Sequence, residues 1–151
     1  GGGCAIALAC DLRVCTPAAR FGVPIARRLG KCLSVTNYPR LLELVGPAHL
    51  KDLLFTGRLI DAAEAKSIGL VSRMAEPDTI ATVVNELAQT IAANAPLTIR
   101  ATKEAVRRIL RSRRPEHEAI DDLIAQCYTS DDFRNAVAAF LEKRSPTFTG
   151  R

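Results

Sequence analysis

Apolar residues recur every three to four positions through the second half of the chain, which is the spacing of one face of an α-helix. The first such segment covers residues 78–93, and Pro96 predicts its end. The pattern resumes over 97–112 and again over 120–127, after which Ser130 predicts the N-cap of a last helix. We therefore expect four short amphipathic helices that pack against each other or against a partner.

The first half of the chain contains short segments that read as strands. They are predicted at 12–16 and 20–24, on either side of a turn at Pro17, and at 70–74. Three short strands are too few for an independent sheet, so we expect their partners to lie outside this sequence. The same reasoning indicates that the sequence begins within a longer protein.

Helices are predicted between these strands at 33–45, despite Pro39, and at 49–55 and 61–69. The last of them is well marked, because Asp61 is a typical N-cap, Glu64 follows three residues later and Gly69 ends the segment. Beyond the strand at 70–74 no further strands are predicted. The change in pattern divides the sequence into residues 1–76 and 77–151.

The first ten residues, GGGCAIALAC, combine three glycines with an apolar run. Residues 4–9 are apolar on all sides, which predicts a buried helix. The first amides of a helix have no intrahelical acceptor and attract an oxygen that carries negative charge. Glycines before them let a ligand approach, and one such donor to an oxyanion contributes about 3–4 kcal/mol. A flexible turn would account for the glycines equally well.

Composition bounds the class of protein. With 151 residues, 48% of them hydrophobic and 25% charged, the chain suits one globular domain with a core. It contains no apolar run long enough to cross a membrane. The cysteines show neither CxxC nor metal-ligand spacing, so we predict no metal site and small buried side chains in a reducing cytoplasm. They are Cys4, Cys10, Cys15, Cys32 and Cys127.

The net charge is +5, and much of the basic excess lies in residues 103–115, KEAVRRILRSRRP. This segment reads either as a solvated helix face or as a patch that receives phosphates. Aromatic residues are only 5% of the chain and tryptophan is absent, so platforms for stacking bases are scarce. A small phosphorylated ligand therefore fits better than nucleic acid.

Four stretches in sequence order resemble the enoyl-CoA hydratase/isomerase (crotonase) family: GGGCAIALACDLRV, ARFGVP, LLELVGPAHLKDLLFTGRLIDAAEAKSIGLVSRM and AAFLEKRSPTF. The resemblance covers essentially the whole chain and implies the C-terminal half or more of a subunit with the α/β, ClpP/crotonase-like fold. Residues 1–76 would complete the core with its oxyanion-hole glycines and acyl-CoA pocket. Residues 77–151 would form the helical region that makes a homotrimer or a dimer of trimers and contacts CoA.

The resemblance also implies site residues and a substrate. Gly2 matches the residue whose backbone N–H binds the thioester oxygen of an acyl-CoA, and Gly1 and Gly3 leave room for it. Phe140 and Lys143 match positions that contact the adenine and the 3′-phosphate of coenzyme A, commonly across a subunit interface. Alternatively, Phe140 packs in a core and Lys143 is a solvated helix end. The substrate would be a CoA thioester, with no tightly bound cofactor.

The sequence departs from the family pattern where hydratases have their two catalytic glutamates. Ala5 and Ile25 stand at those positions, and neither side chain can move a proton. General acid–base catalysis contributes about 10²–10⁴-fold, so hydration by the usual mechanism is doubtful. Tyr38 or Cys32, in the divergent segment that follows, would be the replacement acid. Alternatively, these two residues shape the acyl pocket or its wall, together with the other polar candidates of this segment, Arg27, Arg28, Ser34 and Asn37.

Two hypotheses follow. In the first, the full-length protein is an acyl-CoA enzyme that uses the oxyanion hole and other acids for isomerisation, hydration or C–C cleavage. In the second, it is a non-catalytic acyl-CoA binder or an assembly subunit. The missing glutamates favour the second hypothesis, whereas the glycines and the residues at the CoA end favour the first, which we prefer. The chain alone is expected to be inactive.

Overall fold

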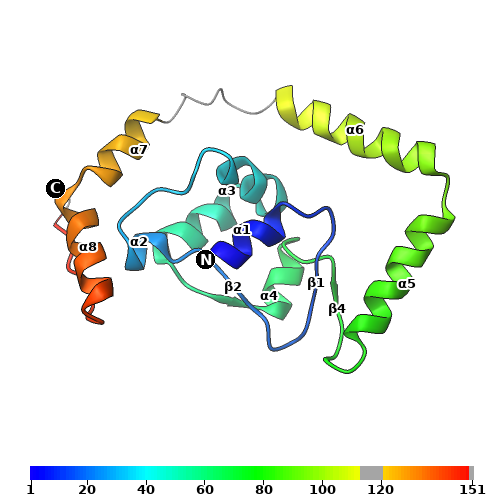
Figure 1. Cartoon of the computed structure of the whole chain (residues 1–151), viewed down its shortest axis with the longest axis horizontal. Helices are drawn as coiled ribbons and strands as arrows, with labels where there is room; N and C mark the ends of the chain where they lie inside the picture. Colours follow the sequence, from blue (N-terminus) through cyan, green and yellow to red (C-terminus); the bar gives the residue numbers. More distant parts are fainter. Residues whose placement is uncertain (113–120, 150–151) are drawn as a thin grey trace.

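The computed structural model describes residues 1–112 and 121–149 (Figure 1). A central body holds the first four helices and all the strands of this part of the chain, and the later helices run around it. In chain order the elements of the body are α1 (Gly2–Leu8), β1 (Val14–Cys15), β2 (Arg20–Phe21), α2 (Ile25–Arg28), α3 (Asn37–Thr56), β3 (Ile60–Asp61), α4 (Ala62–Ser67) and β4 (Arg73–Met74). They are followed by α5 (Ile80–Ala93), α6 (Pro96–Ser112), α7 (Asp121–Tyr128) and α8 (Asp131–Leu141).

The strands find partners within the chain, which corrects the expectation that their partners lie outside it. β1 pairs in parallel with β4, with Val14 opposite Arg73. β2 pairs antiparallel with β3, with Phe21 opposite Ile60. The helix α4 connects β3 to β4 in sequence. The segment β3–α4–β4 therefore supplies the partner strands for both β2 and β1. Each strand is only two residues long, shorter than predicted, and β3 was not predicted at all.

The two helices expected at 33–45 and 49–55 form one element, α3, that is broken where the sequence predicted the gap. Gly46 has φ 72° and ψ 170°, which is not helical, and Pro47 starts the second segment, where its missing N–H costs nothing. The first segment begins at Asn37 rather than at residue 33. Gly57 ends α3 in the left-handed conformation, and its N–H donates to the carbonyl oxygen of Leu53 at 3.1 Å.

Two predicted helix caps are confirmed. The Asp61 carboxylate accepts a hydrogen bond from the backbone N–H of Glu64 at 2.8 Å and so begins α4. The Ser130 hydroxyl oxygen accepts from the backbone N–H of Phe133 at 3.0 Å and begins α8. Both caps depend on residues three positions apart, which is why the sequence predicted them.

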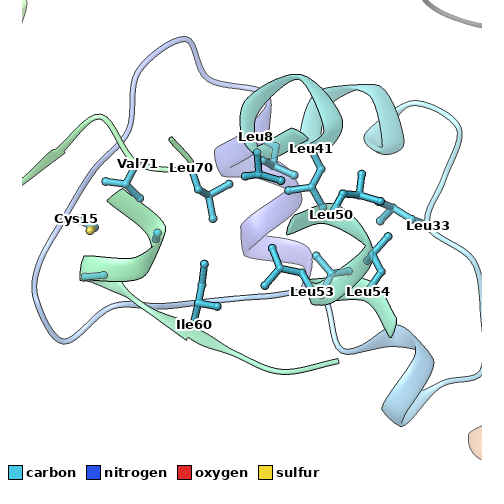
Figure 2. Close-up of a cluster of buried hydrophobic side chains, with 14 residues drawn as sticks. Leu8, Cys15, Leu33, Leu41, Leu50, Leu53, Leu54, Ile60, Leu70 and Val71 are labelled. Carbon is cyan, nitrogen blue, oxygen red and sulfur yellow. The ribbon is translucent and has the colours of Figure 1, made fainter. Parts of the chain in front are cut away.

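The hydrophobic core lies between α1, α3 and α4 (Figure 2). Its most deeply buried members are 0–3% exposed and come from α3, from the β3–α4 segment and from the turn after α4. They are Leu41, Leu53, Ile60, Ala62, Ala65, Leu70 and Val71. The core therefore belongs to the body and draws on the residues up to 71.

α1 is not the buried helix that its apolar sequence predicted. Only Leu8 is buried, where α1 packs on α3, whereas the side chain of Ile6 is 73% exposed. No element of residues 1–112 or 121–149 covers the side of α1 that carries Ile6. An apolar helix is fully buried only when other elements pack against every side of it. In the described ranges, α1 is packed on one side, by α3.

The cysteines also differ from the expectation that all are buried. Cys15 alone is buried, Cys10 is exposed just after the end of α1, and the other three are half-buried. All five are free thiols. The half-buried ones are Cys4, Cys32 and Cys127.

The later helices have apolar side chains on open surfaces. α5 and α6 run along the outside of the body, and α8 lies beside α2 (Figure 1). Val84 on α5 and Val106 on α6 are 43% and 49% exposed. The predicted division near residue 76 falls between β4 and α5; that the two sides are separate domains stays a prediction. Among the helices described, none is long and apolar enough to span a membrane.

Candidate functional site

An open pocket of about 560 Å³ lies beside the first residues of α1. We call it the glycine pocket. Its wall contains three arginines and no carboxylate. The lining residues are Gly1, Gly3, Cys4, Ala7, Arg20, Phe21, Gly22, Pro24, Arg27, Arg28, Gly57 and Leu59. A negatively charged ligand would thus meet positive side chains here and no competing acid.

The start of α1 leaves amide groups available at this pocket. The backbone N–H groups of Cys4 and Ala5 both donate to the carbonyl oxygen of Gly1, at 3.0 and 3.3 Å. The N–H groups of Gly2 and Gly3 therefore precede the first hydrogen bonds within the helix. A Cβ atom built on Gly2 would meet nothing within 4 Å. Crowding within the described chain does not account for a glycine at this position.

Two other glycines fix the position of α2. A Cβ on Gly22 would lie 2.6 Å from the carbonyl oxygen of Arg58, and one on Gly57 would lie 2.7 Å from the Cβ of Arg27. The turn after α3 thus packs directly against the segment that leads into α2. Arg27 and Arg28 are held at the pocket by these backbone contacts.

A second open pocket, of about 590 Å³, shares Arg27 and Arg28 with the first. We call it the arginine–lysine pocket. Its other wall comes from the end of α8 and the residues after it. The lining residues are Arg27, Arg28, Phe140, Lys143, Arg144, Ser145 and Pro146. The two pockets therefore meet at the paired arginines of α2.

Phe140 and Lys143 lie together in this second pocket. Phe140 is 69% exposed, so the alternative that it packs in a core is wrong for the chain as described. Lys143 has φ 57°, a left-handed conformation that is uncommon for a residue with a side chain. Its N–H donates to the carbonyl oxygen of Phe140 at 3.3 Å as α8 ends. A residue held in such a conformation often marks a functional position.

The arginine–lysine pocket has a surplus of positive charge. Arg144 is paired with Glu142, at 2.5 Å between Nε and Oε2. Within residues 1–112 and 121–149, Arg27, Arg28 and Lys143 form no ion pair. Three cations are thus available to an anionic ligand.

Ala5 and Ile25 lie next to the glycine pocket but do not line it. Both are half-buried, and Ile25 packs against the edge of the core. Their neighbours Cys4 and Pro24 do contribute to the pocket wall. Gly2 likewise lies between two lining residues, Gly1 and Gly3, without being one of them.

Cys32 and Tyr38 form a separate cluster with Cys127 and line neither pocket. The Sγ atoms of Cys32 and Cys127 are 3.0 Å apart, and the Tyr38 side chain interacts electrostatically with Cys32. Burial and the hydrogen bond with Cys127 raise the pKa of Cys32 to about 11. Burial also raises the pKa of Tyr38. Both groups are protonated at neutral pH, as an acid must be, but neither lies at a pocket wall, so the predicted role as replacement acid stays a prediction.

The two pockets are lined by four residues that the sequence predicted for the site: Gly1, Gly3, Phe140 and Lys143. The sequence predicted Arg27 and Arg28 only as possible residues of the acyl-pocket wall, and did not predict that they join the two pockets. The signal was present as two adjacent arginines directly after a short apolar segment, but only the fold brings the end of α8 to them. In the described ranges, no three His, Cys, Asp or Glu side chains are grouped so that they could hold a metal ion.

The family profile described as enoyl-CoA hydratase/isomerase matches residues 1–151. The chain is therefore a member of the enoyl-CoA hydratase/isomerase family. Among curated relatives, it is 37% identical to the short-chain-enoyl-CoA hydratase of Clostridium acetobutylicum over 95% of this chain. It is 39% identical to that of Clostridioides difficile over 92% of this chain and 90% of that protein. It spans 55% of the length of the Clostridium acetobutylicum protein.

Solved structures agree with this assignment. A methylmalonyl-CoA decarboxylase in complex with 2-nitronate-propionyl-CoA matches with a TM-score of 0.92 and 27% identity, over all of this chain and 59% of that one. An enoyl-CoA hydratase/isomerase from Pseudoalteromonas atlantica matches with a TM-score of 0.84 and 31% identity, over 99% of this chain and 60% of that one. The chain has part of the α/β crotonase fold, as the sequence predicted.

Proposed function

We propose that the full-length protein binds an acyl-CoA and stabilises an enolate of its thioester, with enoyl-CoA hydratase/isomerase-type chemistry. The observation that carries this proposal is the junction of the two pockets at Arg27 and Arg28. The start of α1 offers free backbone amides beside one pocket, which suit a carbonyl oxygen, and the other pocket holds an exposed aromatic ring and unpaired cations. An acyl-CoA has the complementary groups in the same order: a thioester, phosphates and an adenine.

Gly2 is the proposed oxyanion donor. Its N–H lies at the first position of α1, where no intrahelical acceptor competes for it. The empty space around it, in which a Cβ would meet nothing, is where a ligand atom would approach. Gly1 and Gly3 would border the same approach. A backbone donor of this kind acts without any particular side chain.

The phosphates of CoA would lie in the arginine–lysine pocket. Arg27 and Arg28 have the planar, always charged groups that bind phosphate well, and Lys143 adds a point charge. Phe140 offers an exposed ring at which an adenine can stack. We propose a CoA thioester as the substrate and no tightly bound cofactor.

The reaction would reach the enolate without the usual pair of glutamates. Ala5 and Ile25 leave no acid at those positions, and no carboxylate lines the glycine pocket. Loss of carbon dioxide from a thioester with a second carboxyl group makes an enolate without a general base. Arg20, which lines the glycine pocket and not the arginine–lysine pocket, would favour such an acyl group. The likeness to a methylmalonyl-CoA decarboxylase supports including C–C cleavage among the candidate reactions.

A second candidate function is non-catalytic binding of acyl-CoA, or a role in assembly. It is favoured by Ala5 and Ile25, which carry no acid at the two positions where the family resemblance implies glutamates. Binding alone would still require the amides and the cationic pocket. In either case we propose assembly as a homotrimer or a dimer of trimers, for which the exposed apolar residues of α5 and α6 give a surface.

The test is titration calorimetry of the full-length protein with CoA and with dephospho-CoA, which lacks the 3′-phosphate. Lys143→Ala should lower the affinity for CoA by about tenfold, since a charge-assisted hydrogen bond contributes about 1–3 kcal/mol. The same substitution should leave the affinity for dephospho-CoA nearly unchanged. Lys143→Arg should keep most of the affinity. Equal losses for both ligands would show that Lys143 does not meet this phosphate, and no binding of either ligand would overturn the proposed function.

Lys143→Gly serves as the matched control for folding. Glycine takes a left-handed φ without strain, so this variant should unfold at the same or a higher denaturant concentration than the wild type. It should nevertheless lose CoA affinity as Lys143→Ala does. If the CoA affinities of the variants followed their stabilities, and not the presence of a positive charge at position 143, Lys143 would have a structural role only.

A further inference from the structure

Two thiols that are far apart in sequence lie side by side outside both pockets. Cys32 is in the loop between α2 and α3, and Cys127 is near the end of α7, 95 positions later. Their Sγ atoms are 3.0 Å apart, and the Cys32 thiol also donates to the carbonyl oxygen of Leu123 at 3.5 Å. A disulfide bond is about 2.05 Å long, so the two sulfur atoms need to approach by only about 1 Å to form one.

The surrounding contacts hold the two segments together. Gly30 has φ 60°, and a Cβ there would lie 3.1 Å from the ring of Phe148 and 3.6 Å from the carbonyl oxygen of Asp132. The Asn135 side chain donates to the carbonyl oxygen of Thr147 at 2.6 Å. The loop that carries Cys32, the helix α8 and the residues that follow it are thus packed as one junction. The nearness of the two thiols is a consequence of this junction.

We propose that Cys32 and Cys127 are a redox-modification site that forms a reversible intramolecular disulfide. The oxidant would be a peroxide. One sulfur, as thiolate, attacks a peroxide oxygen, the O–O bond breaks, and the thiol becomes a sulfenic acid. The other sulfur attacks it, the S–S bond forms, the S–O bond breaks, and hydroxide leaves and takes up a proton. Two thiols and hydrogen peroxide thus give one disulfide and two molecules of water.

The environment of Cys32 sets the conditions under which the bond forms. Burial and the hydrogen bond with Cys127 keep the Cys32 thiol protonated at neutral pH, because they raise its pKa to about 11. The thiolate is the reactive form, so oxidation should be slow at pH 7 and faster at pH 9. In a reducing compartment, as the sequence predicts, the resting state is the dithiol and the disulfide is a transient response.

The disulfide would connect the two sides of the arginine–lysine pocket. Cys32 follows α2, which carries Arg27 and Arg28, and Cys127 precedes α8, which carries Phe140. Oxidation therefore fixes α8 relative to α2. Only this effect on the pocket rests on the proposed function, whereas formation of the bond does not. Closing a loop of this length should raise the unfolding temperature by roughly 10 °C.

The experiment treats the purified full-length protein with hydrogen peroxide at pH 7 and pH 9, blocks the remaining thiols by alkylation and maps the peptides by mass spectrometry. The expected result is one linked peptide pair, Cys32 with Cys127, a protein mass lower by two hydrogens, and full reversal by dithiothreitol. Unfolding should occur at a higher temperature in the oxidised protein. If both thiols are found alkylated after the peroxide treatment, or if they form a disulfide only in denaturant, the proposal is wrong.

Three variants complete the test. Cys32→Ser and Cys127→Ser should each abolish the mass change and the rise in unfolding temperature. Cys10→Ser removes an exposed cysteine just after the end of α1, and it should keep both effects. The peptide map of the wild type decides the matter even where a variant fails to fold. CoA titration of the same oxidised sample separates the two proposals, because a disulfide without CoA binding would refute only the proposed function.

Discussion

At the residue scale, the most informative positions are Ala5 and Ile25. The family resemblance implies that the two catalytic glutamates of hydratases belong at these positions, and both residues are half-buried beside the glycine pocket. We expect the full-length protein to hydrate crotonyl-CoA with a kcat well below about 10 s⁻¹, the usual enzyme median. The thioester would be bound and polarised, but no carboxylate would activate the water.

Restoring both acids should raise hydration, whereas Ala5→Glu or Ile25→Glu alone should do little, because residues that act as a unit give non-additive effects. Loss of the enoyl-thioester absorbance measures the rate. The double variant with glutamine at both positions is the control, since it has the same shape without an acid. A wild type that already turns over faster than the median would contradict this account of the missing acids.

Local sequence was enough to predict some residues of the site and not others. Phe140 and Lys143 were named because their motif is continuous in sequence. Arg27 and Arg28 were predicted only as possible residues of the acyl-pocket wall. Their meeting with Phe140 and Lys143 was not predicted, because it arises from contact between segments more than a hundred residues apart. The same holds for Cys32 and Cys127, whose nearness depends on how α7 returns to the body.

At the scale of elements, one ion-pair cluster connects α3 to α4. The guanidinium of Arg58 binds the Asp52 carboxylate through Nε at 2.8 Å and the Glu64 carboxylate through Nη1 at 2.9 Å. Hydrogen bonding from Arg58 lowers the pKa of Glu64 below its usual value. A carboxylate with a lowered pKa in the folded state stabilises that state above its unfolded pKa, about 4.3, and loses this contribution as the pH falls.

Glu64→Gln should therefore lower stability at pH 7 and flatten the loss of stability between about pH 5 and pH 3. The effect should be modest, because the side chains of the cluster are 36–40% exposed. Urea unfolding at a series of pH values measures it. Glu86→Gln, at a site with no ion pair in the described ranges, is the control. If the stability of Glu64→Gln falls as steeply between about pH 5 and pH 3 as that of the wild type, the cluster does not contribute to the acid dependence of stability.

The elements differ in how far they could be predicted. α4 and α8 were found because their caps and apolar periods are local signals. α2 has four residues and β3 has two, which is too short for any periodic pattern. Their conformations are set by contacts across the fold, such as the approach of Gly22 and Gly57 to their neighbours.

At the scale of the whole molecule, the apolar faces of the outer helices predict association. Large hydrophobic side chains on α5, α6 and α7 are exposed, among them Val84, Val106 and Leu123. The chain by itself should not be a stable monomer. Its unfolding should depend on protein concentration, measured by calorimetry together with light scattering. A sharp transition of a monomer, independent of concentration, would contradict this.

A matched pair of substitutions on α5 tests which surface associates. Val84→Glu places a charge among the apolar residues and should shift the assembly toward smaller species. Gln89→Glu adds the same charge at an exposed polar position and should leave the assembly unchanged. Equal effects of the two would show that α5 contributes only through net charge.

The central claim is that the backbone amide of Gly2 binds the thioester carbonyl. The direct measurement compares the affinity of the full-length protein for propionyl-CoA with its affinity for S-propyl-CoA, the thioether without the carbonyl. Gly2 is the first residue of α1, where proline is tolerated, so Gly2→Pro removes the N–H while keeping the helix. Gly2→Ala keeps the N–H.

We predict that the wild type and Gly2→Ala prefer the thioester by about tenfold, as expected for one hydrogen bond. Gly2→Pro should bind the two ligands equally, with an unchanged unfolding temperature. A folded Gly2→Pro variant that retained the full preference for the thioester would contradict the account.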